Sequence, residues 1–297
     1  MRLDELPRSE NVEDRRGAGL RVPGGGSGLG IGTIVVLGLV GYWLGIDPRL
    51  LIGGAEVLSG GDSSQQQSST ESKVGAPSDQ MGQFVSAVLG STETQWRNIF
   101  TRYRKTYEAP TLVMFSRATS SACGLAQSAM GPFYCPSDQK VYLDTSFFQD
   151  LQQRFHGCDV GSKACQFSQA YVIAHEVGHH VQNLLGVLPK AHAMQQSMDK
   201  VNANRVQVRV ELQADCLAGV WAYHAEETWK FIEPGDVEAA MQTSAAIGDD
   251  RLQRQAQGYV VPDAFTHGSS EQRTRWFTAG LKSGKIESCD TFSTAQQ

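Results

Sequence analysis

The distribution of apolar and polar positions divides the chain into parts of different character. One run of twenty residues carries no charged side chain, and the segment after it is rich in Ser, Gln and Gly. Sustained helical and strand periodicities begin only beyond residue 80. From this pattern we predict a charged, disordered segment over residues 1–26, a transmembrane helix over 27–46, a flexible linker over 47–80, a folded domain over 81–290 and a tail over 291–297.

The apolar run has the length of a membrane span. Its sequence is SGLGIGTIVVLGLVGYWLGI, which as a helix would reach about 30 Å, the hydrocarbon thickness of a bilayer. A buried core helix or a signal peptide is the alternative. The run is longer than the apolar part of most signal peptides, and no clear A-x-A cleavage sequence follows it. The sequence therefore favours a membrane anchor.

Arginines are distributed unevenly around this run. Five of them precede it, whereas Arg49 is the one cation that follows before Lys73. Because the more cationic flank of a span usually stays in the cytoplasm, we expect the N-terminus inside the cell. Everything after residue 47 would then lie on the outer side of the cytoplasmic membrane.

The cysteines agree with an exported domain. All six follow the apolar run, and an even number of cysteines in an oxidising compartment indicates disulfides, with buried free thiols as the alternative. The disulfide pairs we expect are Cys158 with Cys165, Cys123 with Cys135, and Cys216 with Cys289.

The net charge of −5 and the pI near 5.8 give no argument for nucleic acid as a partner.

The folded domain is expected to contain strands followed by helices. Residues 111–117 and 140–148 have the composition of strands, and a helical pattern near residue 81 is interrupted by a glycine and a serine. This order predicts an α+β domain that is mostly helical and carries a small sheet. Helices are predicted over residues 167–185, 200–227, 236–247 and 269–280.

The segment AHEVGHHV places polar side chains in an apolar helix. His175 and His179 are four residues apart, so they lie on one face of a helix with Glu176 beside them. This is the H-E-x-x-H pattern, in which two imidazoles bind Zn²⁺ and the carboxylate accepts a proton from a zinc-bound water. A chance match on a solvated helix is the alternative, but the flanking residues are apolar. We therefore predict a zinc site.

A catalytic zinc needs a third protein ligand. Glu211 and Asp215, in ELQADCLAGVW, are again four residues apart on an amphipathic helix. We predict that Glu211 binds the metal and that Asp215 accepts the free ring N–H of a ligand histidine. The alternative is a solvated carboxylate near Arg205 or Arg209, but neither arginine stands three or four residues from Glu211.

A third cluster, FTHGSSEQRTRWF, contains His267 and Arg273. Either residue could stabilise the negatively charged oxygen of a tetrahedral intermediate, so both are catalytic candidates. The alternative is that they serve in capping and packing of the helix that begins near residue 269.

Several segments together resemble a known family. The pair HEVGHH and ELQADCLAGVW looks like the gluzincin branch of zinc metallopeptidases. More closely, the chain resembles the bacterial "putative neutral zinc metallopeptidase" family of single-pass membrane proteins. This resemblance implies a zincin-like fold, zinc chemistry and a place in the bacterial cytoplasmic membrane. The E-x-x-A-D and H-x(5)-R elements are also similar to those of membrane-associated CAAX-processing and quality-control zinc proteases. The segments that carry the closer resemblance are CGLAQSAMGPFYCPSDQKVYLD, AHEVGHHVQNLLG, ELQADCLAGVWA, AIGDDRLQRQAQG and FTHGSSEQRTRWF.

The expected function is that of a membrane-anchored zinc metalloendopeptidase, a hydrolase acting on proteins or peptides. We expect an extended substrate to pair with a strand edge within residues 131–146. Two alternatives stay open. One is an envelope scaffold with a structural zinc, in which Cys216 would supply the fourth ligand. The other is a metal-dependent amidase acting on cell-wall peptides.

Overall fold

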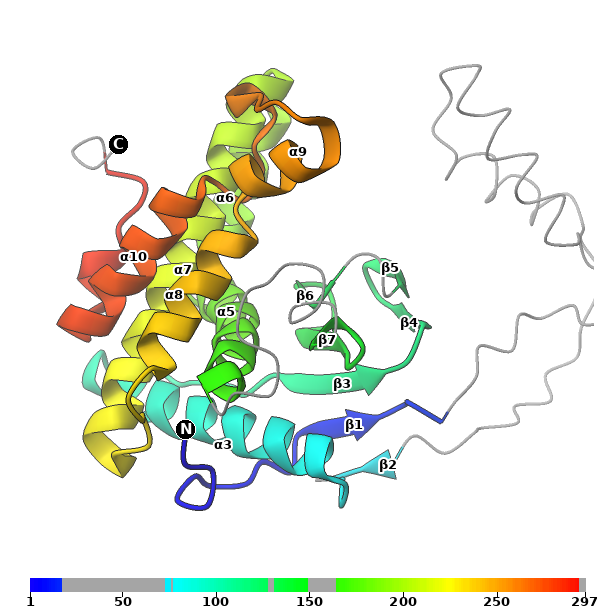
Figure 1. Ribbon diagram of the computed structural model, residues 1–297, viewed down its shortest axis with the longest axis vertical. Coiled ribbons are helices and arrows are strands. Elements are labelled where there is room, and N and C mark those ends of the chain that lie inside the picture. The colour runs from blue at the N-terminus through cyan, green and yellow to red at the C-terminus, as the bar shows by residue number, and fades with distance from the viewer. Residues whose placement is uncertain (18–72, 76, 128–130, 149–163, 294–297) are drawn as a thin grey trace, which may run out of the picture. The chain divides into compact units, whose positions relative to one another are not determined.

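The computed structural model describes residues 1–17, 73–75, 77–127, 131–148 and 164–293. Within these ranges, a sheet of five strands has the order β2-β1-β3-β7-β6, and the helices pack beside it (Figure 1). The α+β class and the mostly helical content predicted from the sequence are confirmed. The apolar run at 27–46, predicted to be a transmembrane helix, lies outside the described residues. So do residues 18–26 of the predicted N-terminal segment and residues 294–297 of the predicted tail.

Two parallel strands form the centre of the sheet. Strand β3 (Thr111–Phe115) pairs in parallel with β7 (Lys140–Asp144), and each lies within a segment predicted to be a strand. The side chains of β3 from Leu112 to Phe115 are all fully buried. A parallel strand covered on both faces is expected to be continuously apolar, and this explains the sequence LVMF.

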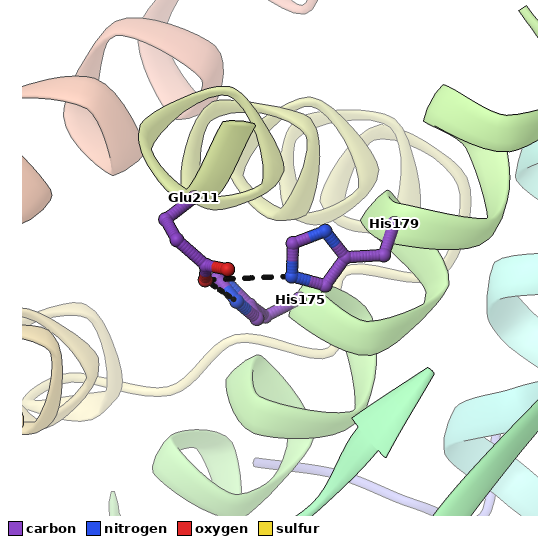
Figure 2. A group of neighbouring side chains, drawn as sticks. All are labelled: His175, His179 and Glu211. Atoms are coloured by element: carbon purple, nitrogen blue, oxygen red, sulfur yellow. Dashed lines mark hydrogen bonds and ion pairs between the residues drawn. The ribbon is translucent and has the colours of Figure 1, made fainter. Parts of the chain in front are cut away.

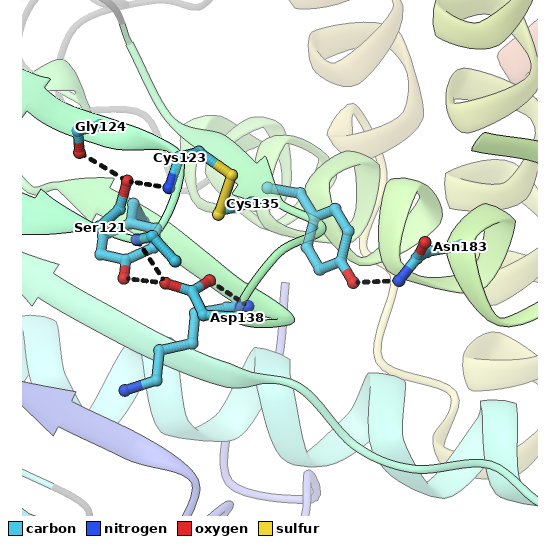
Figure 3. The surroundings of a disulfide bond; sticks show 10 residues. Ser121, Cys123, Gly124, Cys135, Asp138 and Asn183 are labelled. Atoms are coloured by element: carbon cyan, nitrogen blue, oxygen red, sulfur yellow. Dashed lines mark hydrogen bonds between the residues drawn. A yellow bond between two sulfur atoms is a disulfide. The ribbon is translucent and has the colours of Figure 1, made fainter. Parts of the chain in front are cut away.

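Strand β6 (Phe133–Cys135) forms one edge of the sheet. It pairs antiparallel with β7, and no strand among the described residues pairs with its other side. The Cys123–Cys135 disulfide joins β6 to the hairpin of β4 (Ala118–Ser121) and β5 (Gly124–Gln127) (Figure 3). Asn183 also donates a hydrogen bond of 3.0 Å to the Tyr134 hydroxyl, which ties β6 to the neighbouring helix. The position of this edge is therefore fixed by both a covalent bond and a polar contact.

The helical part is built from long helices in direct contact. Helix α5 (Ala164–Leu184) crosses α7 (Lys200–Trp229), and α10 (Ser270–Ser283) packs along α7. Helix α3 (Gln80–Arg102) contacts α5 and α7, and α8 (Asp236–Ala246) packs against α5 and α10. The shorter helices are α6 (Val187–Gln196), α9 (Asp249–Gln257), η2 (Pro262–Ala264) and η3 (Ile286–Cys289).

Glycines allow the long helices to approach closely. A Cβ atom at Gly178 of α5 would lie 2.9 Å from the Ala214 carbonyl oxygen of α7. Where α7 meets α10, a Cβ atom at Gly219 would overlap the Phe277 carbonyl, and one at Gly280 would overlap the Cys216 carbonyl. The backbones are therefore in contact at both crossings, which no larger residue would permit.

The prediction of disorder over residues 1–26 is wrong for residues 1–17, which are part of the folded unit. Strand β1 (Val12–Asp14) lies between β2 (Lys73–Val74) and β3. The Arg2 amide donates to the Phe231 carbonyl at 2.8 Å, and the Ser9 amide donates to the Ser86 carbonyl at 3.0 Å. A strand of three residues, VED, is too short to show a periodicity, so the composition alone indicated a solvated segment.

The boundaries on the other side of the apolar run also shift. Strand β2 lies within the predicted linker, and α3 begins one residue before the predicted start of the domain. None of the helices within the described ranges combines the length and the apolar character needed to cross a membrane.

Two of the predicted disulfides are confirmed. Cys123 is bonded to Cys135, and Cys216 is bonded to Cys289 across 73 residues of sequence. Cys165 is also disulfide-bonded. Its expected partner, Cys158, lies outside the described residues.

Candidate metal centre

Three side chains from two helices converge on one point. His175 and His179 come from adjacent turns of α5, and Glu211 comes from α7 opposite them (Figure 2). One Glu211 carboxylate oxygen, Oε2, lies 3.1 Å from His175 Nε2 and 3.4 Å from His179 Nε2. One donor atom from each residue lies within 4.8 Å of the others.

These separations suit a zinc ion. Tetrahedral ligands at about 2.1 Å from a metal are about 3.4 Å apart, close to both of the distances from Glu211 Oε2. Two imidazoles and one carboxylate are also the donor set typical of a catalytic zinc with one open position. The residues present therefore fit this metal in both geometry and chemistry.

Asp215 contacts the ring of His175 on the side away from Glu211. Its Oδ1 atom lies 2.8 Å from His175 Nδ1. A carboxylate accepts hydrogen bonds, so Nδ1 carries a proton, and Nε2 is the ring nitrogen directed at Glu211. Burial alone would lower the pKa of His175, but the Asp215 carboxylate and then Glu211 raise it to about 10. The Asp215 and Glu211 carboxylates thus favour a positive charge at the ring of His175.

Burial would likewise raise the pKa of Glu211, yet the neighbouring His179 and His175 imidazoles hold it well below its usual range. The second carboxylate oxygen of Glu211, Oε1, accepts a hydrogen bond of 2.9 Å from the Gln207 amide. One oxygen is therefore held by the protein, and the other is directed at the two histidines.

Arg273 is bound to the carboxylate of Asp215. Its guanidinium is buried and donates from both Nε and Nη2 to Asp215, each at 2.9 Å. It also donates to the Tyr171 hydroxyl, which in turn donates to Asp215. Arg273 thus neutralises and orients the carboxylate behind His175, and it also lines the cavity beside the site.

His267 lies at the cavity on the other side of the site. Its side chain is 51% exposed, and its Nδ1 atom is 3.3 Å from Asp249 Oδ1. The Asp249 carboxylate also accepts the backbone N–H groups of Thr266, His267 and Gly268. Asp249, which sequence reasoning missed, therefore fixes both the turn and the imidazole.

A cavity of about 970 Å³ joins these features. Glu176 lies in its wall, 7% exposed, and burial raises the pKa of this carboxyl above its usual value. The cavity extends from the edge strand β6 past the site to α6, so it is large enough for several residues of a peptide. Its lining includes Phe133, Tyr134, Leu188, His192 and His267.

Comparison with known proteins places this chain in a family. The model of the family described as "Putative neutral zinc metallopeptidase" matches residues 1–292. The chain belongs to this family. The expectation from the sequence motifs is thereby confirmed at the level of the family and of its zinc peptidase class.

Relatives extend over most or all of the chain. YpfJ, an uncharacterized protein of Escherichia coli K12, is 46% identical over 98% of this chain and 99% of its own length. Rv2575, an uncharacterized protein of Mycobacterium tuberculosis, is 43% identical over 71% of this chain and 70% of its own. No solved structure matches.

Proposed function

We propose that the protein is a zinc-dependent endopeptidase that acts outside the cytoplasm. The observation that carries this proposal is the convergence of His175, His179 and Glu211 beside the cavity that contains Glu176. When bound, zinc would polarise the scissile carbonyl and acidify a water molecule. The two disulfides support an oxidising compartment, and the apolar run at 27–46 supports attachment to a membrane.

The residues of the chain have separate roles in this proposal. His175, His179 and Glu211 hold the metal, and Asp215 with Arg273 behind it keeps His175 in the binding tautomer. Glu176 accepts the proton of the attacking water and delivers it to the leaving amine, for which burial of its carboxyl is favourable.

The substrate is proposed to be an extended peptide that pairs with β6. This strand lines the cavity and has one edge without a strand partner among the described residues. A peptide added there would obtain main-chain hydrogen bonds while its side chains enter the cavity. The apolar lining by Phe133, Tyr134 and Leu188 favours apolar side chains near the cleaved bond.

The scaffold alternative loses its fourth ligand. Cys216 is bonded to Cys289 and therefore offers no thiolate to the metal. A structural zinc is usually closed by four side chains, whereas this site opens onto a cavity.

The test compares envelope peptides from cells that carry the wild-type protein and from cells that carry Glu176→Gln. Cleavage products of defined sequence should be present in the wild-type sample and absent from the Glu176→Gln sample. Cell-wall cross-peptides that change instead would favour the amidase, and identical peptide profiles would contradict an enzymatic role.

We expect His267→Ala to lower kcat roughly 10²-fold on a peptide identified in this way, while zinc content stays unchanged. Loss of one donor to the developing oxyanion has an effect of this size. His192→Ala is the matched control, because His192 also lines the cavity but bonds only to Gln196 among the described side chains. A change confined to KM would show that His267 binds substrate without stabilising the transition state.

A further inference from the structure

We propose that Gln182 and Gln213 are positioning residues that fix the zinc-binding tautomer of His179. The inference rests on the proposed metal site and concerns two side chains that do not themselves contact the metal. Gln182 is fully buried on α5, one turn after His179, and its Oε1 atom lies 2.9 Å from His179 Nδ1.

The orientation of both amides follows from carbonyl groups that can only accept. Gln182 Nε2 lies 2.8 Å from the Val210 carbonyl oxygen, and Gln213 Nε2 lies 2.9 Å from the Cys289 carbonyl oxygen. Each of these nitrogens must therefore be the donating NH₂ group. Gln182 Nε2 also donates to Gln213 Oε1 at 2.9 Å, so the two amides are mutually consistent.

With this orientation, Gln182 presents its oxygen to His179. The ring nitrogen Nδ1 must then carry a proton, so Nε2, which lies 3.4 Å from Glu211 Oε2, is the nitrogen left to bind a metal. His175 reaches the same tautomer through a charged carboxylate, whereas His179 reaches it through a neutral amide. The two ligand histidines are thus oriented by chemically different partners.

The chain of hydrogen bonds ends on a covalent anchor. Cys289, whose carbonyl accepts from Gln213, is bonded to Cys216 of α7. The Thr291 hydroxyl adds a hydrogen bond of 2.7 Å to the Arg209 carbonyl. The C-terminal segment is therefore held on α7, and through Gln213 and Gln182 it supports the imidazole of His179.

The test measures zinc affinity by competition with a chelator. Gln182→Leu should weaken zinc binding about 10- to 100-fold, as expected for loss of the partner of a ligand histidine. Gln213→Leu should act in the same direction and less strongly. In the double variant the losses should not add, because both residues serve one chain of contacts.

Gln95→Leu is the matched control. Gln95 is also a buried glutamine, 3% exposed, and it donates to Thr228 far from the metal centre in sequence. It should lose stability but keep the wild-type zinc affinity. Unchanged affinity in Gln182→Leu, or an equal loss in Gln95→Leu, would overturn the inference. Absence of zinc binding by the wild-type protein would instead contradict the proposed function. If Gln182→Leu does not fold, the zinc affinity of Gln213→Leu is the deciding measurement. Gln213 is half-buried, so its substitution should disturb folding less.

A second and independent observation concerns the N-terminal segment. Val12, Glu13 and Asp14 pair with β3, and Glu13 and Asp14 also pair with β2 on the other side. Neighbouring strands lie about 4.8 Å apart, whereas a bilayer core is about 30 Å thick. Residues that flank the segment 18–72 therefore meet in one sheet, and they cannot do so from opposite sides of a membrane.

Two of the five arginines that suggested a cytoplasmic N-terminus form ion pairs within the folded domain. Arg15 forms an ion pair of 2.8 Å with Glu13, and Arg16 forms one of 2.7 Å with Asp14 and another with Asp79. Their charges are thus compensated within the domain. From these contacts we infer that residues 1–17 share the compartment of the metal centre. This replaces the expected single-pass topology with one in which both flanks of residues 18–72 lie on the same side of the membrane.

The test is a disulfide between the cross-strand partners Glu13 and Val74. In the full chain in its native membrane, Glu13→Cys with Val74→Cys should form this bond under copper phenanthroline, as detected by mass spectrometry of unreduced peptides. The single variants are the controls. The natural Cys123–Cys135 bond in the same samples reports on recovery of disulfide peptides.

Absence of the 13–74 bond in samples that retain the natural bond would overturn the inference. A second measurement does not depend on β1 tolerating a substitution. Glu5→Cys lies at an exposed position, and a membrane-impermeant maleimide added to intact spheroplasts should label it. Glu238→Cys, at an exposed position of the domain, is labelled in parallel. Labelling of Glu238→Cys in intact spheroplasts together with labelling of Glu5→Cys only after lysis would contradict the inference. Labelling of both only after lysis would instead contradict the proposed location outside the cytoplasm.

Discussion

Replacing Glu176 with Gln is expected to leave zinc bound and to lower peptide cleavage by roughly 10²- to 10⁴-fold. The substitution keeps the size of the side chain and removes its ability to accept and return a proton, which is the contribution of a general base and acid. The metal should stay because Glu176 is not among the three converging donors. Metal content and the kcat of the purified full-length protein are the two measurements.

A control with the same chemical change is available on α8. Glu238 is exposed, and Glu238→Gln should leave both zinc content and kcat unchanged. Loss of zinc from the Glu176 variant would mean that this carboxylate is a ligand. Retention of wild-type cleavage would mean that proton transfer depends on another residue.

The second large effect is expected from Asp215→Ala. This carboxylate is fully buried and interacts with Tyr171, His175 and Arg273. Its removal leaves the buried guanidinium of Arg273 without a countercharge, a loss of about 3–5 kcal/mol in the free energy of unfolding. Zinc affinity should also fall about 10- to 100-fold, because His175 loses the acceptor for its Nδ1 proton.

The two effects separate in the double variant Asp215→Ala with Arg273→Met. Here no charge is left unpaired, so much of the stability should return in urea unfolding of the metal-free protein. Zinc affinity should stay low, because His175 still lacks its acceptor. A double variant no more stable than Asp215→Ala would show that the buried ion pair is not the source of the loss.

The residues proposed to bind the metal could be singled out because they lie at helical spacing on two long helices. His175 and His179 lie one turn apart, as do Glu211 and Asp215, and both helices are long enough for their period to be visible. The one step that the spacing did not supply was the contact between α5 and α7. The family resemblance supported that contact, and the structure provides the distances.

Other features depend on tertiary contacts, which the spacing of apolar residues along the sequence does not reveal. The glycine and serine that interrupt the pattern of α3 are explained by their neighbours. A Cβ atom at Gly90 would overlap the Pro7 carbonyl, and Ser91 accepts a hydrogen bond from the Trp221 indole. The interruption was therefore a sign of packing against the N-terminal segment at Gly90 and against α7 at Ser91. Arg273 was recognised as important, but its partner Asp215 is 58 residues away and its role required the fold.

The backbone contacts at Gly178, Gly219 and Gly280 have a consequence for how substrates enter. Helices that touch through their main chains cannot slide or separate without losing that contact, so α5, α7 and α10 form a preorganised frame for the metal. The other two walls of the cleft are β6, which the Asn183 side chain ties to α5, and the turn that carries His267, which the Asp249 side chain holds. Selection among substrates would accordingly reside in those two walls, while the reactive geometry stays the same for every peptide that fits.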